Sequence, residues 1–372
     1  MQNTVELTIE ELAPLARGIS RHEGKIIFTD YTLPGEKVLA VIKEEHKDYA
    51  TAELIEIITG SAHRVKPHCP HYGICKGCNM QHIEYQHALE YKKNWLRKLL
   101  TDNKLTDIPH IETISSSPYG YRNRFQIHIE NKKPGYRKKD GRHFPINQCP
   151  ILNQAAAPIF SDDFSDIPNK KRLNLFCHNN RLYGRKGAED FSVTMANRTY
   201  YGRTDLFFQS NTEVLEKLIQ WIEEKTENMS PLSVWDLYSG SGLFSSLFAD
   251  RAESVKLVEE VTESLALAER QLGKKANYYA MTVEEFFSYP AASKPPDLII
   301  LDPPRSGISK SARKSIIKTA SPTLLYISCN PASFARDAAQ LIRHSGYRIK
   351  DIVLCDFYPQ THHAEIASIL QR

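Results

Sequence analysis

The first sixty or so residues show apolar and polar positions in short alternating runs. Residues 24–44 alternate on both sides of a Pro34–Gly35 turn, and residues 49–58 repeat the pattern. A period of two residues predicts strands, because successive side chains of a strand point to opposite faces. Several short strands in so few residues predict a small β-barrel over residues 1–60.

Residues 61–200 give a mixed pattern. Residues 86–103 predict a helix, because their apolar side chains recur at helical spacing, at Leu89, Trp95, Leu96, Leu99 and Leu100. Residues 122–130 alternate like a strand. We therefore expect a mixed α+β central domain, with the apolar face of the helix in a core.

Residues 201–372 alternate between apolar strand patterns and amphipathic helix patterns, which is typical of a Rossmann-like α/β domain with a parallel sheet. The strands are expected at residues 232–239, 254–260, 296–304, 323–329 and 348–356, and helices at 212–226, 262–276 and 331–346. In such a sheet ligands bind at the carboxyl ends of the strands. The motifs at these ends are therefore the candidates for chemistry.

Composition narrows the class of protein. The chain has 372 residues, its acidic N-terminus lacks the apolar core of a signal peptide, and no apolar run has the length of a membrane span. We expect a cytoplasmic protein without membrane contact, and nothing in the chain indicates an obligate protein partner, so we expect a monomer.

The net charge is only +4, but the basic residues cluster in segment 131–143. This segment holds Lys132, Lys133, Arg137, Lys138, Lys139 and Arg142, with Tyr121, Phe125 and Tyr136 nearby. Cations that meet phosphates and rings that stack on bases are typical of an RNA surface. A solvated hairpin loop has the same composition, and both interpretations stay open from charge alone.

A glycine turn follows the strand expected at 232–239. Gly240 and Gly242 permit a tight turn, but Ser245 replaces the third glycine of a dinucleotide fingerprint. Asp236 adds negative charge where a diphosphate would be repelled. This favours S-adenosylmethionine as the cofactor. Glu259, one β-α-β step later, is placed to hydrogen-bond ribose hydroxyls.

Two further strand ends and the last segment carry reactive groups. Asp302 begins an Asp-Pro-Pro-Arg loop, in which Arg305 replaces the aromatic residue that amino-group methyltransferases use to hold a target nitrogen. Cys329 follows the next strand, and Glu365 follows a pair of histidines near the C-terminus. A thiol, a carboxylate and a methyl donor suit carbon 5 of uracil. Thiolate addition to carbon 6 makes carbon 5 nucleophilic, and a base then removes the carbon 5 proton.

The motifs "DLYSGSG", "LDPPRSG", "YISCNP" and "HHAEIASIL", in this order, resemble the RNA uracil-C5 methyltransferases. The N-terminal "LPGE" segment resembles the RNA-binding TRAM module. The resemblance implies that Cys329 is the nucleophile and Glu365 the base. It also implies a set of contacts to S-adenosylmethionine from Gln209, Tyr238, Glu259 and Asp302. Leu243 and Ala364 depart from the Asn and Val that are usual at their positions.

Seven cysteines in a chain expected to be cytosolic indicate metal binding or catalysis rather than disulfides. Cys69, Cys75 and Cys78 form a C-x5-C-x2-C run, and Cys149 offers a fourth ligand. Spacing alone allows either zinc or an iron–sulfur cluster. The family resemblance implies a [4Fe-4S] cluster with a structural or RNA-facing role. Cys177 and Cys355 remain, and we interpret them as buried or incidental.

The resulting hypothesis is an S-adenosylmethionine-dependent methyltransferase that modifies carbon 5 of a uridine in 23S rRNA. Its expected domains are a TRAM-like barrel over 1–60, an iron–sulfur domain with a basic RNA-facing loop over 61–200, and a catalytic domain over 201–372. One alternative is methylation of the T-loop of tRNA. A further alternative is a non-catalytic RNA-binding iron–sulfur protein. A cytosine-C5 methyltransferase is disfavoured, because the loop after 296–304 lacks a cysteine.

Overall fold

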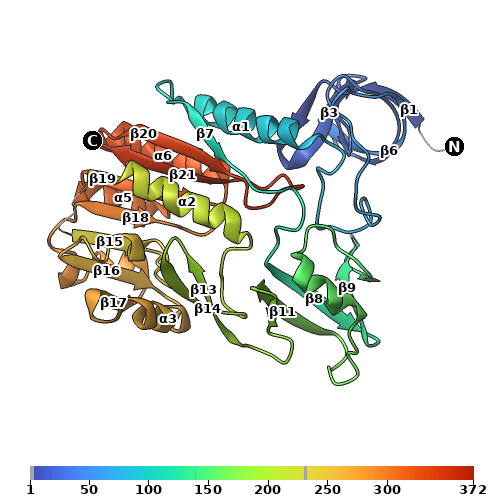
Figure 1. Cartoon of the computed structure of the whole chain (residues 1–372). Helices are drawn as coiled ribbons and strands as arrows, with labels where there is room; N and C mark the ends of the chain where they lie inside the picture. Colours follow the sequence, from blue (N-terminus) through green and yellow to red (C-terminus); the bar gives the residue numbers. More distant parts are fainter. Residues whose placement is uncertain (1–3, 139, 230–232) are drawn as a thin grey trace.

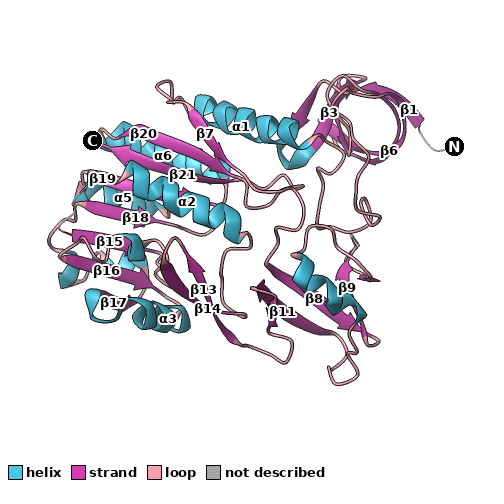
Figure 2. Cartoon of the chain, in the orientation of Figure 1, coloured by secondary structure: helices cyan, strands magenta, loops and turns pink. Residues whose placement is uncertain are grey.

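The computed structural model describes residues 4–138, 140–229 and 233–372. Lys139 of the basic segment and Leu232, the first residue of one predicted strand, lie outside the described residues. The chain forms a curved N-terminal sheet, a small central sheet and a large C-terminal sheet covered by helices (Figure 1, Figure 2). Among the described helices, none is long and apolar enough to cross a membrane.

The N-terminal sheet curls like a barrel (Figure 1), with strand order β1-β5-β6-β4-β3-β2. Its strands are β1 (Thr4–Thr8), β2 (Glu11–Ala13), β3 (Arg17–His22), β4 (Lys25–Asp30), β5 (Lys37–Glu45) and β6 (Tyr49–Thr59), with a short 3-10 turn (Pro14–Ala16) after β2. The alternation seen in the sequence fills the interior, where Leu7, Ile27, Val38 and Ala40 are buried. The predicted β-rich module is therefore present.

The central sheet has the order β10-β9-β8-β11-β12. Its strands are β8 (Arg124–Glu130), β9 (Lys133–Arg137), β10 (His143–Pro145), β11 (Lys171–His178) and β12 (Arg181–Tyr183), and the 3-10 helix η2 (Gln154–Ser161) lies against it. The basic segment forms the β9–β10 hairpin. A separate hairpin of β13 (Asp190–Met195) and β14 (Arg198–Arg203) contacts helix α3 of the C-terminal domain.

The C-terminal sheet has eight strands in the order β17-β16-β15-β18-β19-β21-β20-β7. Its strands are β15 (Ser233–Leu237), β16 (Ser254–Glu259), β17 (Asn277–Ala280), β18 (Leu298–Leu301), β19 (Thr323–Ser328), β20 (Arg348–Cys355) and β21 (Glu365–Gln371), with β7 (Ile111–Ile114) at the edge. β15 to β19 are parallel, but β21 is antiparallel to both β19 and β20. The prediction of a parallel sheet is wrong at β21, which lies between β19 and β20, whereas β20 runs in the same direction as β19. The loop 356–364 turns the chain straight back, whereas a parallel neighbour needs a crossover connection.

Helices cover both faces of this sheet. They are α2 (Thr212–Lys225), α3 (Thr262–Leu272), α4 (Val283–Phe286), α5 (Lys310–Thr319) and α6 (Pro331–Ser345), with short 3-10 turns at Ser245–Leu247, Gly273–Lys275 and Pro290–Ala292. Every residue of β18 and β19 is buried, as expected for strands covered on both faces.

Two elements from the middle of the chain join this domain. Helix α1 (Tyr85–Asp102) packs against α6, and β7 pairs in parallel with β20 (Figure 1). Leu96 and Leu100 of α1 lie in the same apolar core as Phe334 of α6. The segment before β8 therefore contributes directly to the packing of the C-terminal domain.

Candidate active site and cysteine pocket

The carboxyl ends of β15, β16, β18 and β19 and the start of β21 surround one cavity of about 700 Å³. Its walls include every residue predicted from the sequence for cofactor binding or catalysis: Gln209, Tyr238, Glu259, Asp302, Cys329 and Glu365. These residues are spread over more than a hundred positions of the chain, and the sheet brings them together.

The glycine turn lies between β15 and the cavity. Tyr238, Gly240 and Gly242 all have positive φ, at 71°, 54° and 75°. A Cβ on Gly242 would lie 3.0 Å from Leu257 Cδ2 and 3.1 Å from Ala268 Cβ. Glycine at this position therefore lets the turn lie directly against β16 and α3.

Glu259 is held at the rim of this turn by two backbone donors. Its Oε2 accepts a hydrogen bond from Gly240 N, and its Oε1 accepts one from Val261 N, both at 2.9 Å. The carboxylate thus has a fixed direction at the cavity wall, which is the requirement for binding vicinal hydroxyl groups.

Asp236 has a different role from the one predicted. It is only 1 % exposed, it does not line the cavity, and it accepts a hydrogen bond from Ser245 N. Burial raises the pKa of its carboxyl to about 7. Asp236 therefore stabilises the backbone that follows the glycine turn. The predicted direct repulsion of a diphosphate is not supported, because Asp236 does not line the cavity.

Cys329 leaves β19 beside the Asp302 loop. Asn330 Nδ2 donates a hydrogen bond to Arg305 O at 2.9 Å. Asn330 Oδ1 accepts a hydrogen bond from Ala332 N and so caps the N-terminus of helix α6, whose first residue is Pro331. The residues that follow the cysteine therefore end the strand, begin the helix and fix the neighbouring loop. This arrangement leaves the half-buried thiol at the cavity wall.

Three groups at the centre of the proposed chemistry, Glu365, Asp302 and Cys329, have pKa values shifted toward their protonated forms. Burial, with Asp302 nearby, raises the pKa of Glu365 to about 8. Burial also raises the pKa of Asp302 to about 7, and that of the Cys329 thiol to about 11. Gln209 Nε2 donates to Glu365 at 3.5 Å. A cationic ligand would lower these pKa values, because positive charge favours carboxylates and thiolates.

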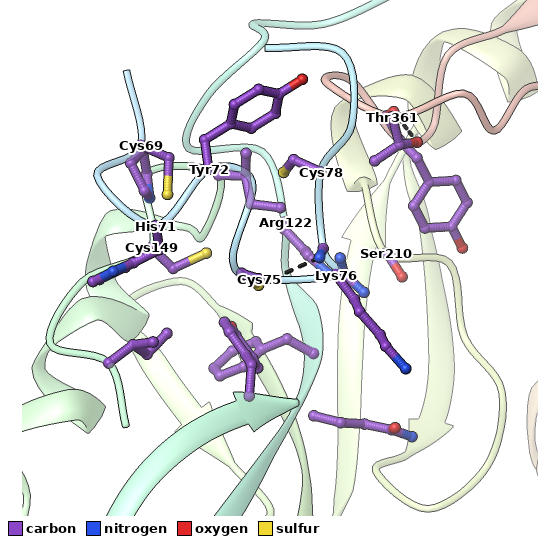
Figure 3. A pocket seen from close by; sticks show the side chains of 18 of the residues that line it. Cys69, His71, Tyr72, Cys75, Lys76, Cys78, Arg122, Cys149, Ser210 and Thr361 are labelled. Atoms are coloured by element: carbon purple, nitrogen blue, oxygen red, sulfur yellow. Dashed lines mark hydrogen bonds between the residues drawn. The ribbon is translucent and has the colours of Figure 1, made fainter. Parts of the chain in front are cut away.

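The four predicted metal ligands line a second cavity of about 470 Å³. Cys69, Cys75 and Cys78 come from the segment between β6 and α1, and Cys149 follows β10. Figure 3 shows their sulfurs facing a shared space beside Arg122. All four are free thiols, and burial raises the pKa of each, that of Cys78 to about 12.

The four sulfurs are not gathered as closely as the ligands of one tetrahedral zinc ion. No three of the four, all of them described residues, have sulfurs within 4.8 Å of one another, a criterion that His63, Glu84 and His87 satisfy elsewhere. A tetrahedral zinc site with Zn–S bonds of about 2.3 Å would hold its sulfurs roughly 3.8 Å apart.

The two cavities adjoin. Arg305, Tyr358 and His363 line both of them. The sequence predicted individual ligands and reacting groups that line these two cavities, but it did not point to Tyr358 or to this shared wall. Both depend on the position of loop 356–364. This position follows from the antiparallel pairing of β21 with β19 and β20, which the sequence pattern does not indicate.

The basic hairpin lies next to the cysteine pocket. Tyr136 and Arg137 line that pocket, and Lys138 forms a β-bridge with Cys75. Arg137 pairs with Glu130 at 2.7 Å, and Arg142 pairs with Asp140 at 2.6 Å. The segment is thus a partly ion-paired hairpin, and residues 136–138, at the turn end of β9, lie beside the predicted metal site.

Comparison with known proteins decides the family. The family model described as tRNA (Uracil-5-)-methyltransferase matches residues 293–372, and the TRAM domain model matches residues 3–55. An uncharacterized RNA methyltransferase of Treponema denticola is 33% identical, with 95% of each chain covered. The chain belongs to the RNA uracil-C5 methyltransferase family. This membership confirms the resemblance seen in the sequence motifs.

Other family members match along the whole chain. The 23S rRNA (uracil(1939)-C(5))-methyltransferase of Vibrio vulnificus is 27% identical over 99% of this chain and 96% of its own. The solved structure of Pyrococcus abyssi tRNA (uracil-54, C5)-methyltransferase in complex with S-adenosyl-L-homocysteine has a TM-score of 0.76 and 22% identity, and covers 98% of this chain and 99% of that chain. The overall fold is therefore that of an S-adenosylmethionine-dependent methyltransferase with an N-terminal TRAM domain.

Proposed function

We propose that the protein methylates carbon 5 of a uridine in 23S rRNA, with S-adenosylmethionine as the methyl donor. The observation that carries this proposal is the single cavity shared by Cys329, Glu365, Asp302 and the glycine turn. The choice of rRNA rests on relatives such as those of Vibrio vulnificus and Marinomonas, named as 23S rRNA methyltransferases, which match 94% or more of both chains.

In this proposal Cys329 is the nucleophile. Its thiol loses a proton, a loss that the nearby Arg305 favours, and the thiolate adds to carbon 6 of uracil. The electron pair that moves to carbon 5 then forms the bond to the methyl carbon. S-Adenosylhomocysteine leaves with the electron pair of the broken sulfur–methyl bond.

Glu365 completes the reaction in this proposal. Its carboxylate takes the proton from carbon 5, and the electron pair of that bond re-forms the carbon 5–carbon 6 double bond and expels the Cys329 thiolate. The cofactor is held by Gln209, Tyr238, Glu259 and Asp302. The uracil must leave its stack to reach a cavity of this depth.

We also propose that Cys69, Cys75, Cys78 and Cys149 hold a [4Fe-4S] cluster. The support is the donor set of four free cysteines, the wide spacing of their sulfurs, and the cation of Arg122 facing a site that would carry net negative charge. Such a cluster would tie the segment before α1 to the loop after β10. Residues 1–60 and the β9–β10 hairpin would bind RNA on either side of the active site.

Methylation of tRNA is the second candidate, because the Pyrococcus abyssi structure is named for uridine 54 of tRNA. Labelled methyl transfer to 23S rRNA and to total tRNA, both from a strain that lacks this enzyme, separates the two. We expect label in one uridine of 23S rRNA. Label in tRNA alone would overturn the substrate assignment but not the reaction.

A further inference from the structure

The residue after the third cysteine of the cluster motif lies against the segment that leads into Glu365. Asn79 and Met80 both donate their backbone N–H to Gln360 O, at 3.1 and 3.0 Å. Asn79 Oδ1 accepts from His362 N at 3.0 Å, and Asn79 Nδ2 lies 3.0 Å from His362 Nδ1. The cysteine segment and the segment 360–362 are therefore joined by four hydrogen bonds.

Both polar atoms of the Asn79 side chain make hydrogen bonds. Its Nδ2 also donates to Leu15 O of the N-terminal module at 2.7 Å, so both amide hydrogens and the amide oxygen are used. Because an amide nitrogen only donates, His362 must accept through Nδ1 and therefore be neutral. Burial lowers the pKa of His362 to about 4, which agrees with a neutral ring.

The segment 360–362, which Asn79 contacts, has a backbone conformation that its surroundings must stabilise. Gln360 has a φ of 68°, a conformation that residues with a Cβ rarely adopt. Gln360 and Thr361 are about 5 % and 4 % exposed, and the buried Ala364 leads directly to Glu365. A shift of residues 360–362 would therefore be passed along a short, packed stretch of backbone to the carboxyl group.

We propose that Asn79 is a positioning residue for proton abstraction, which couples the filled cysteine site to the placement of Glu365. This inference rests on the proposed function, because it assigns Asn79 to one step of that reaction. Adduct formation by Cys329 on the other wall of the cavity does not depend on the Asn79 contacts. Replacement of Asn79 should therefore slow proton abstraction from carbon 5 and leave adduct formation by Cys329 unchanged.

The test compares the holoenzyme with its Asn79→Ala variant at equal iron and sulfide content. With 5-fluorouridine RNA and S-adenosylmethionine, we expect both proteins to form the covalent adduct to the same extent, because no proton can be removed from carbon 5. With unsubstituted RNA we expect kcat to fall by about 10-fold to 100-fold, since small misplacements have costs of this size. KM should fall with it, so that kcat/KM stays nearly unchanged, because the slowed step follows methyl transfer. The RNA–protein intermediate should accumulate on denaturing gels.

The matched control is Asn94→Ala, which removes an exposed asparagine of α1 that bonds only Arg97 among the described residues. It should behave like the unchanged protein. If Asn79→Ala does not retain its metal, Asn79→Asp replaces it, because it keeps the acceptor for His362 N and loses both donations. Unchanged turnover of Asn79→Ala or Asn79→Asp, or an equal loss of adduct and turnover, would overturn the inference. Absence of an adduct in the unchanged protein would instead refute the proposed function.

Discussion

At the scale of single residues, burial rather than ion pairing determines the state of the reacting groups. Glu365 is 3 % exposed and has Gln209 as its hydrogen-bond donor, and the nearby Asp302 carboxyl adds to the rise in its pKa. The identities of Cys329 and Glu365 were predictable from the sequence, because each stands in a distinctive motif. The protonation states of Glu365 and Asp302 were not predictable, because they depend on the burial of both carboxyl groups at one cavity.

Glu365 should make stability depend on pH. Its pKa is about 8 in the native protein against a usual 4.5, so the native state keeps a proton that the unfolded chain loses between about pH 5 and pH 8. Stability contributed by this group therefore falls as pH rises through that range. We expect the melting temperature of Glu365→Gln, relative to the unchanged protein, to rise between pH 5 and pH 8. A constant difference would show that Glu365 is not buried as a neutral acid.

At the scale of elements, the loop 356–364 is held by parts of the chain far from it in sequence. Asp356 and Lys92 of α1 form an ion pair at 2.7 Å, with exposures of 0 % and 3 %. Tyr85 OH donates to the same carboxylate, and Tyr121 OH donates to Pro359 O. The helix at 86–103 was predictable from its apolar periodicity, but its ion pair was not, because a lysine in an amphipathic helix normally faces water.

Breaking this pair should destabilise the protein strongly. Lys92→Met leaves the Asp356 carboxylate buried without its cation, and we expect the free energy of unfolding in urea to fall by about 3–5 kcal/mol. The double variant Lys92→Met/Asp356→Leu should recover part of this loss, because it removes the unpaired charge. A loss below about 1 kcal/mol, the value of an exposed pair, would contradict this role.

At the scale of the whole molecule, two cavities share a wall where the cysteine segment and the central domain meet the C-terminal domain. The succession of β-rich, mixed and α/β regions was predictable from the changes of hydrophobic period along the chain. The antiparallel β21 and the addition of β7 to the edge of the large sheet were not, because a short apolar run does not specify its neighbours. The adjacency of the cysteine pocket and the catalytic cavity follows from these two features.

The cysteine pocket should hold iron and sulfide. Protein purified without oxygen should contain about four iron ions and about four acid-labile sulfides per chain, bound by four cysteines. Cys78→Ser should lower both contents, whereas Cys355→Ser, at a buried cysteine outside the pocket, should leave them unchanged. One zinc ion per chain without sulfide would contradict the cluster.

The central claim is that Cys329 attacks the uracil ring. The most direct test is to incubate the protein with 5-fluorouridine-containing 23S rRNA and S-adenosylmethionine, digest the product, and locate the modified residue by mass spectrometry. The account predicts a methylated fluorouridine nucleotide attached to Cys329, and no adduct in Cys329→Ala. An adduct on another residue, or none on RNA that the protein binds together with its cofactor, would contradict it.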